Sequence, residues 1–327
     1  MKKILIPIVL LACTLRASAC INGETRELKD GTVLFADPGD ENRVPRGHAF
    51  NDINYGRVMA SLEAGWRRTG HAEYRSDMGV LLILQKKYSE ARNLYLELER
   101  SKPGRYSTAS NLGTVYELMG RNDSALHWIR RAVAINPASH KGSEWIHVNI
   151  LEAKVAGKTD PATAELLDID FGTDARPAAP RQHASYAKLD EALSYQLSER
   201  MSFIAPPDPV IGRLLFELGN VRWLQGDLYS VPDVYAAAQR YGFRDTLLTR
   251  RLARIHGELR AKLAGDTTAQ AIGREEAADT ARFAYTTNPE AGEAPKVKRR
   301  EGLFWAVGAG FLLLLGFVGF LFGRRTR

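Results

Sequence analysis

The fold is decided by residues 106–137, which read YSTASNLGTVYELMGRNDSALHWIRRAVAINP. Large apolar side chains recur at helical spacing on both sides of Gly120, and glycine readily takes the left-handed conformation that ends a helix. Pro137 ends the second run, because a residue without an amide hydrogen cannot continue a helix. We therefore predict two helices joined by a tight turn, which cross closely at the small residues Gly113 and Ala125.

A second copy of this pattern immediately precedes this stretch. Its glycine, alanine and proline precede their counterparts by 34 positions (79 against 113, 91 against 125, 103 against 137). A period of this length indicates repeated helical hairpins. The two copies, residues 72–105 and 106–139, resemble the tetratricopeptide repeat, whose helix–turn–helix units stack into a solenoid with a concave binding face. The packing positions of the two copies are Gly79, Ala91, Pro103, Gly113, Ala125, Ala132 and Pro137.

A third, looser copy is predicted over residues 212–245. Gly219, Gly226 and Tyr235 stand at repeat positions, but Val231 replaces the packing alanine. The resemblance implies an all-α fold, an α-solenoid of tetratricopeptide-type helical hairpins. Such repeats typically present a concave groove to a peptide or protein, so the resemblance implies a binding function.

The rest of the chain gives the predicted domain organisation. A glycine turn at Asp30-Gly31 predicts a small β-hairpin in the N-terminal segment. A Pro-, Asp- and Ala-rich stretch predicts a linker, with a short extended piece at 166–171. In chain order, the predicted parts are a signal peptide (1–19), the N-terminal segment (20–50), a helical repeat domain (51–156, including a further helix at 140–156), the linker (157–184), a second helical segment (185–263), a stalk (264–301), a transmembrane helix (302–323) and a basic tail (324–327).

The N-terminal end has the anatomy of a secretory signal peptide. Lys2 and Lys3 precede an apolar run that is too short to span a bilayer, and Ala17-Ser18-Ala19 forms a small-residue cleavage site. Cleavage after this site makes Cys20 the first mature residue. Two interpretations stay open: lipidation of Cys20, as in bacterial lipoproteins, or ordinary cleavage that happens to expose a cysteine.

The C-terminal end predicts a membrane anchor. Residues 302–323 are apolar and uncharged, and as a helix they extend about 33 Å, enough for a hydrocarbon core of about 30 Å. The arginine-rich tail that follows favours the cytoplasmic side. Together with the signal peptide, this places the repeats outside the cytoplasm, in a bacterial periplasm or cell envelope.

Composition and motifs exclude several functional classes. Cys13 and Cys20 are the only cysteines in the sequence, so the mature body can form no internal disulfide. The net charge of +7 comes partly from the two targeting segments and does not indicate nucleic-acid binding. The sequence has no phosphate-binding loop, nucleophile elbow or metal-ligand spacing, so we expect no enzyme, no cofactor and no metal site.

The expected function is a protein–protein interaction scaffold, which binds a peptide or protein in the concave groove. An alternative is a structural envelope spacer, anchored at both ends and without a groove ligand. The first helix of each copy should face the groove. The expected groove residues are Ser110, Asn111, Thr114 and Glu117 in the second copy, with Arg213, Asn220 and Trp223 in the third.

Overall fold

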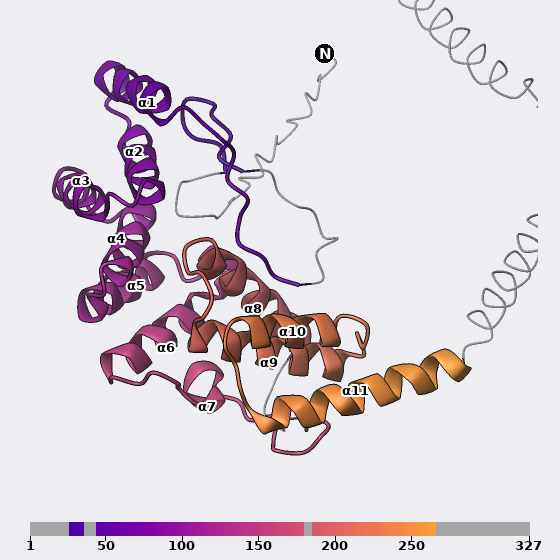
Figure 1. The fold of residues 1–327 in the computed structure, drawn as a ribbon. Coiled ribbons are helices and arrows are strands. Elements are labelled where there is room, and N and C mark those ends of the chain that lie inside the picture. Colours follow the sequence, from indigo (N-terminus) through magenta and orange to yellow (C-terminus); the bar gives the residue numbers. More distant parts are fainter. Residues whose placement is uncertain (1–25, 36–43, 180–184, 266–327) are drawn as a thin grey trace, which may run out of the picture. The chain divides into compact units, whose positions relative to one another are not determined.

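A computed structural model describes residues 26–35, 44–179 and 185–265 of the chain (Figure 1). The chain divides into two compact units, residues 1–263 and 264–327, and nearly all described residues belong to the first. The helices are α1 (Tyr55–Thr69), α2 (Ala72–Leu84), α3 (Tyr88–Ser101), α4 (Tyr106–Leu118), α5 (Asn122–Ile135), η1 (Ser139–Gly142), α6 (Glu144–Val155), α7 (Thr163–Leu167), α8 (Tyr186–Met201), α9 (Pro209–Gln225), α10 (Val231–Arg240) and α11 (Thr246–Gly265). Every regular element in these ranges is a helix, so the all-α prediction is confirmed.

The predicted signal peptide, Cys20 and the apolar segment 302–323 lie outside the described residues. Among the helices that the structure does describe, none combines the length and the apolar character needed to cross a membrane.

Three helical hairpins share one crossing geometry. A Cβ atom added to Gly79 of α2 would lie 2.3 Å from the Tyr95 ring of α3, and one added to Gly113 of α4 would lie 2.4 Å from Ile129 of α5. In α9 and α10 the same contact joins Gly219 to Tyr235, again at 2.4 Å and again sixteen residues on. Only glycine permits this approach, so all three hairpins are built on one packing rule.

The turn inside each hairpin is left-handed. Gly120 has φ +72° and Gly226 has φ +86° at the ends of α4 and α9. In the first hairpin the equivalent position is Lys86, which takes φ +58° without the freedom of glycine. A non-glycine residue in this region costs about 1–2 kcal/mol, so the first hairpin carries a local strain that the other two lack.

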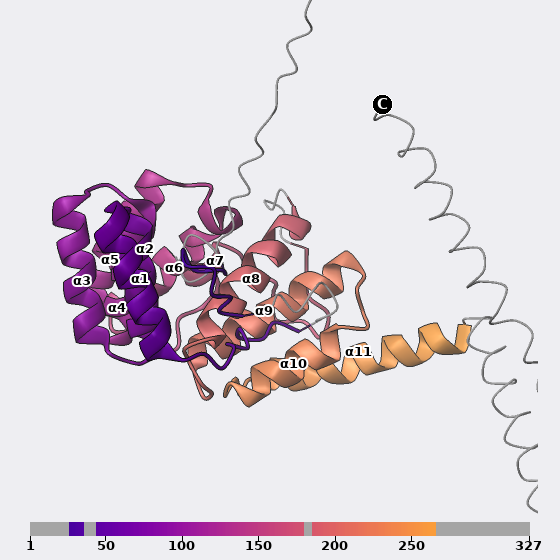
Figure 2. The same cartoon turned by 90° about the horizontal axis from the view of Figure 1, so that it is seen from above.

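The helices form two hydrophobic cores. One holds the apolar side chains of α1 to α5 together with Leu151 of α6, and the other those of α7 to α11 together with Ile146 and Ile150 of α6. Figure 2 shows α6 between these two groups of helices, and it packs on α5 on one side and on α8 on the other. The two cores are therefore joined through α6 rather than by a free connection.

The described part of the predicted linker, residues 157–179, is more ordered than predicted. They contain the short helix α7, and Leu166, Leu167, Ile169 and Phe171 are all buried in the second core. The predicted extended piece is thus partly helical and fully packed. The physical reason is that four large apolar side chains stand within six residues, and burying them stabilises the fold more than a solvated loop would.

The N-terminal segment does not form the predicted β-hairpin. Gly31 does make a tight turn with φ +89°, but in the described ranges only two isolated antiparallel bridges occur, Glu27 with Val33 and Phe35 with Phe50. Leu28, Leu34 and Phe35 of this turn are buried in the first core. The backbone hydrogen bonds of this segment close the turn itself, as from Leu34 N to Arg26 O, and the described residues are too few to build a sheet.

Candidate functional site

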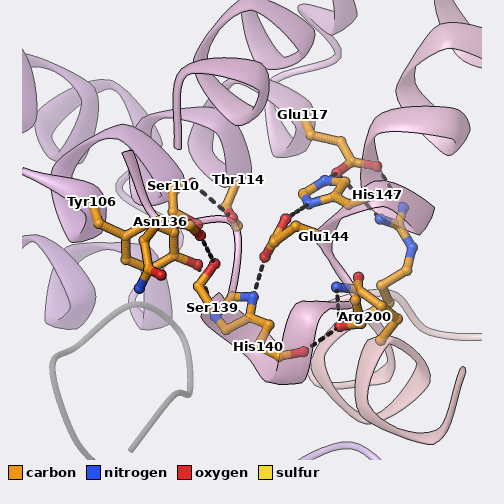
Figure 3. Close-up of polar contacts among 12 residues, drawn as sticks. Tyr106, Ser110, Thr114, Glu117, Asn136, Ser139, His140, Glu144, His147 and Arg200 are labelled. Atoms are coloured by element: carbon orange, nitrogen blue, oxygen red, sulfur yellow. Dashed lines mark hydrogen bonds and ion pairs between the residues drawn. The ribbon is translucent and has the colours of Figure 1, made fainter. Parts of the chain in front are cut away.

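A small cavity of about 60 Å³ lies beside the first helix of the second hairpin. Helices α4, α6 and α8 and the short η1 provide its walls, which combine charged groups with the apolar side chains Leu118, Phe203 and Ile204. Figure 3 shows the polar groups that converge there. The polar and charged residues that line the cavity are Ser110, Thr114, Glu117, His140, Glu144, His147, Gln196, Glu199 and Arg200.

Glu117, near the end of α4, contacts three basic side chains. Its Oε1 atom accepts hydrogen bonds from Arg200 Nη2 at 2.5 Å and Lys154 Nζ at 2.6 Å, while its Oε2 atom lies 2.7 Å from His147 Nε2. The side chain of Glu117 is only 9% exposed. Burial raises the pKa of this carboxyl, but Arg200, His147 and Lys154 outweigh the effect and hold its pKa well below the usual range.

Glu144, at the start of α6, lies between two histidines (Figure 3). Its Oε1 atom is hydrogen-bonded to His140 Nδ1, and its Oε2 atom is 3.4 Å from His147 Nδ1. Burial alone would raise the pKa of Glu144, but the polar contacts and positive charge of these two imidazoles lower it below the usual range. In turn, burial lowers the pKa of His147, but the carboxylates of Glu117 and Glu144 raise it above the usual value.

The backbone of η1 directs His140 into the cavity. His140 has φ +50°, a left-handed conformation that is uncommon for a residue with a Cβ atom. Its ring stacks on Tyr195 of α8, with 5.0 Å between ring centroids, and its Nε2 atom is 3.4 Å from the Tyr106 hydroxyl. Strain of this kind persists only where surrounding contacts impose it, and it concentrates at functional sites.

Three of the predicted groove residues line this cavity and one does not. Ser110, Thr114 and Glu117 of α4 are among its lining residues. Asn111 is fully buried instead, and its side-chain amide donates to the Tyr95 hydroxyl at 2.9 Å. Helical geometry explains why Asn111 was wrongly predicted. Asn111 follows Ser110 and lies about 100° further around the helix, so its side chain faces the preceding hairpin.

The predicted groove residues of the third copy do not share one surface. Asn220 is fully buried and accepts a hydrogen bond from the Tyr235 hydroxyl at 2.5 Å. Trp223 is also buried, with its Nε1 atom donating to Glu258 of α11 at 3.1 Å. Arg213 pairs with Asp160 at 2.8 Å beside a separate open pocket. Helix α11 and the 157–179 segment therefore cover the face that was expected to be a groove.

The chain also covers the concave face of the first copy. Ser76 and Val80, on the groove side of α2, are fully buried, and the backbone N–H of Lys29 donates to Asp77 of the same helix at 2.6 Å. The turn at residues 26–35 packs on the same helix, and the groove-side residues of α2 are covered by the chain itself. The cavity lies at the second copy instead.

An extended segment, residues 44–50, packs against the C-terminal end of helix α8. The backbone N–H of His48 donates to the Ser202 hydroxyl at 2.8 Å, and its Nε2 atom is 3.0 Å from Glu199. A Cβ atom on Gly47 would lie 2.4 Å from the carbonyl oxygen of Met201, so the backbone lies directly on the end of α8. This contact fixes the cavity wall that α8 supplies.

Sequence reasoning missed the residues that complete the site from outside α4. The sequence shows no metal-ligand spacing among its histidines, yet His140 and His147 both line the cavity. Nothing in the sequence distinguishes Arg200 from any other basic residue of an amphipathic helix. The spacing of His140, Glu144 and His147 by four and three residues was the available clue, because it places them on one face around a helix start.

The two cavity carboxylates Glu117 and Glu144 are not suited to act as general acids. A general acid at neutral pH needs a raised pKa, yet both have lowered pKa values. Throughout the part of the chain that the structure describes, no group of three metal-ligating side chains has a geometry suited to a metal ion.

Comparison with known proteins identifies one repeat directly. Residues 107–136, which form α4 and α5, match the tetratricopeptide repeat family. Tetratricopeptide-type repeats generally mediate protein–protein interactions, and proteins built from them are typically non-enzymatic scaffolds. No curated protein matches the sequence.

Two solved structures that match the chain show only a limited likeness. One is TTC0263, a thermophilic TPR protein of Thermus thermophilus, with 14% identity, a TM-score of 0.31 and coverage of 62% of this chain and 90% of that chain. The other is BtubC (BKLC) from P. vanneervenii, with 16% identity, a TM-score of 0.30 and coverage of 76% of this chain and all of that chain. Neither likeness bears on the function of this chain.

Proposed function

We propose that this chain is a protein-binding scaffold, and that part of a protein partner enters the cavity between α4, α6 and α8. The observation that carries the proposal is the position of the cavity. It lies on the concave side of the hairpin that matches the tetratricopeptide family, where repeats of this type take their partners. Its half-buried apolar wall and convergent polar groups are the usual make-up of a specific binding site.

The proposal is tested by filling the cavity without touching its ion pairs. Leu118 lines the cavity at the end of α4 and is only partly buried, so Leu118→Trp should block entry and leave the fold intact. Ile135→Trp, at the exposed end of α5, adds the same ring away from the cavity and is the control. Cross-linked complexes are captured from solubilised membranes of the producing cell. A protein recovered with wild type and Ile135→Trp but lost with Leu118→Trp supports the proposal; equal recovery with both variants rejects it.

The scaffold is proposed to lie outside the cytoplasm of a bacterial cell, held by the apolar segment 302–323 with residues 324–327 inside. The support comes from the sequence, which combines the targeting pattern at 1–19 with a span-length apolar run and an arginine tail. Protease added outside intact spheroplasts should digest the repeats and leave a small membrane-bound C-terminal fragment. Full protection of the repeats would place them on the cytoplasmic side. Mass spectrometry of the mature N-terminus decides whether Cys20 carries lipid.

One observation favours the alternative of a structural envelope spacer. The groove-side residues Ser76 and Val80 of the first copy are fully buried, so the repeats offer no continuous groove within the described part of the chain. A spacer needs its length and its anchors but no ligand. If Leu118→Trp supports normal growth and envelope integrity while deletion of the whole gene does not, the spacer function is favoured over the scaffold.

A further inference from the structure

Two buried polar atoms in the cavity wall lack a hydrogen bond. No described residue provides a hydrogen-bond partner for Glu144 Oε2 or for Arg200 Nε. Both residues line the cavity, and their side chains are only 3% and 5% exposed. Buried polar atoms in native proteins nearly always find a partner, so an open acceptor and an open donor on two residues that line one cavity point to a polar guest.

Existing contacts hold these two groups in place. The other oxygen of Glu144 is bonded to His140, and the guanidinium of Arg200 is held by Glu117 at 2.5 Å. Glu144 Oε2 is 3.4 Å from His147 Nδ1, which is longer than the roughly 2.7–3.2 Å of an ordinary N–H···O hydrogen bond. Neither side chain can turn to satisfy its open atom without breaking a contact that it already makes.

The charges around the cavity favour a neutral guest. When the His140 and His147 imidazoles are neutral, the carboxylates of Glu117 and Glu144 are balanced by the cationic side chains of Arg200 and Lys154, and Glu199 is paired with His48. An additional buried charge then has no counter-ion among these groups, and an unpaired buried charge is strongly unfavourable. A polar, uncharged guest keeps this balance.

We propose that the cavity binds a neutral carboxamide group, the side chain of an asparagine or glutamine of the protein partner. This inference rests on the proposed function, and it names the chemistry that the site recognises. The amide N–H donates to Glu144 Oε2, and the amide oxygen accepts from Arg200 Nε. A carboxylate has no donor and an ammonium has no acceptor, whereas an amide carries both on separate atoms. The apolar wall of Leu118, Phe203 and Ile204 receives the aliphatic stem.

The test uses three probes of similar size: propionamide, propionate and propylammonium. Their binding to the full chain in detergent is followed by the ring resonances of the cavity histidines. We expect saturable binding of propionamide with a Kd of about 1–10 mM, as suits a fragment of few atoms, and binding of both ions at least about tenfold weaker. If an ion binds as well as the amide, or if no probe saturates because a water molecule satisfies both atoms, the inference is wrong.

Two variants locate the probe. Arg200→Lys keeps the positive charge but removes Nε, and it should weaken propionamide at least about tenfold while an unchanged near-ultraviolet spectrum shows that the fold persists. Leu118→Trp should abolish binding and Ile135→Trp should leave it unchanged. Propionamide binding that survives in Leu118→Trp places it elsewhere and overturns the inference.

The two proposals can fail separately. If partner capture depends on Leu118 but propionamide does not bind, the scaffold proposal is supported and the carboxamide proposal is rejected. If propionamide binds in the cavity but Leu118→Trp does not affect partner capture, the carboxamide site is supported. The proposal that the partner enters this cavity is then rejected.

Discussion

Arg200 Nη2 of α8 lies 2.5 Å from Glu117 Oε1 of α4, although 83 residues separate the two in sequence. The pair is buried, with side-chain exposures of 5% and 9%. It links the second hairpin of the repeat region to a helix of the second core. The cavity therefore exists only when both cores have formed and docked.

Removing one partner of this pair should be costly. Arg200→Met leaves Glu117 buried with fewer cations, and we expect a loss of about 3–5 kcal/mol in the free energy of unfolding. Arg130→Met breaks an ion pair with Glu152 whose side chains are 58% and 47% exposed, and it should cost less than about 1 kcal/mol. Urea denaturation of both variants measures the difference. Equal losses would mean that the buried pair contributes no more than a surface one.

The network should make stability fall on both sides of a weakly acidic optimum. Glu117 and Glu144 have lowered pKa values, so their contribution is present above about pH 4.5 and is lost as the pH falls through their folded-state pKa. His147 has a raised pKa, so its contribution is complete below about pH 6.5 and is lost as the pH rises through its folded-state pKa.

Thermal unfolding across the acidic, neutral and alkaline range tests this dependence. His147→Gln should flatten the alkaline side of the curve and weaken the acidic side without abolishing it, because Arg200, Lys154 and His140 still lower the pKa of the two carboxylates. His127→Gln, at an exposed position of α5, is a matched histidine control for the alkaline side. If the two variants have the same pH profile, the folded-state pKa of His147 is not coupled to the carboxylates.

The close crossing at Gly113 should be sensitive to a single methyl group. A Cβ atom there would lie 2.4 Å from the Ile129 side chain, so Gly113→Ala should destabilise the protein by about 1–3 kcal/mol through overpacking. Gly113→Ala combined with Ile129→Val should recover part of the loss by making room. Gly56→Ala is the control, because its Cβ would lie 3.5 Å from Asn54. If chemical denaturation shows that Gly113→Ala leaves the free energy of unfolding unchanged, the close crossing of α4 and α5 at Gly113 is contradicted.

A glycine at Lys86 should stabilise the first hairpin. Lys86 holds φ +58° where the second hairpin has Gly120, and relief of this strain outweighs the greater backbone entropy of glycine. We expect Lys86→Gly to add about 0.5–1 kcal/mol to the free energy of unfolding, measured in urea. Lys87→Gly, at φ −85°, should be destabilising instead. A loss of stability in Lys86→Gly would show that the lysine side chain makes a compensating contact.

The sequence by itself determined the helical hairpins. Glycine and alanine at a fixed period, with prolines and left-handed turn positions at the helix ends, specify local structure through backbone sterics and the need for close packing. These forces act between residues near in sequence, so the pattern of 72–139 was sufficient. The same pattern placed Ser110, Thr114 and Glu117 on the cavity side of α4.

Only the tertiary structure decided what that side of the repeats faces. Asn111 lies one residue from the cavity but is buried against Tyr95, and Trp223 lies under α11. Arg200 reaches Glu117 because α6 docks α8 against the repeats, and burial then makes each charge depend on its partner. Contacts between residues so distant in sequence depend on how two cores pack, and no local pattern of residues encodes that arrangement.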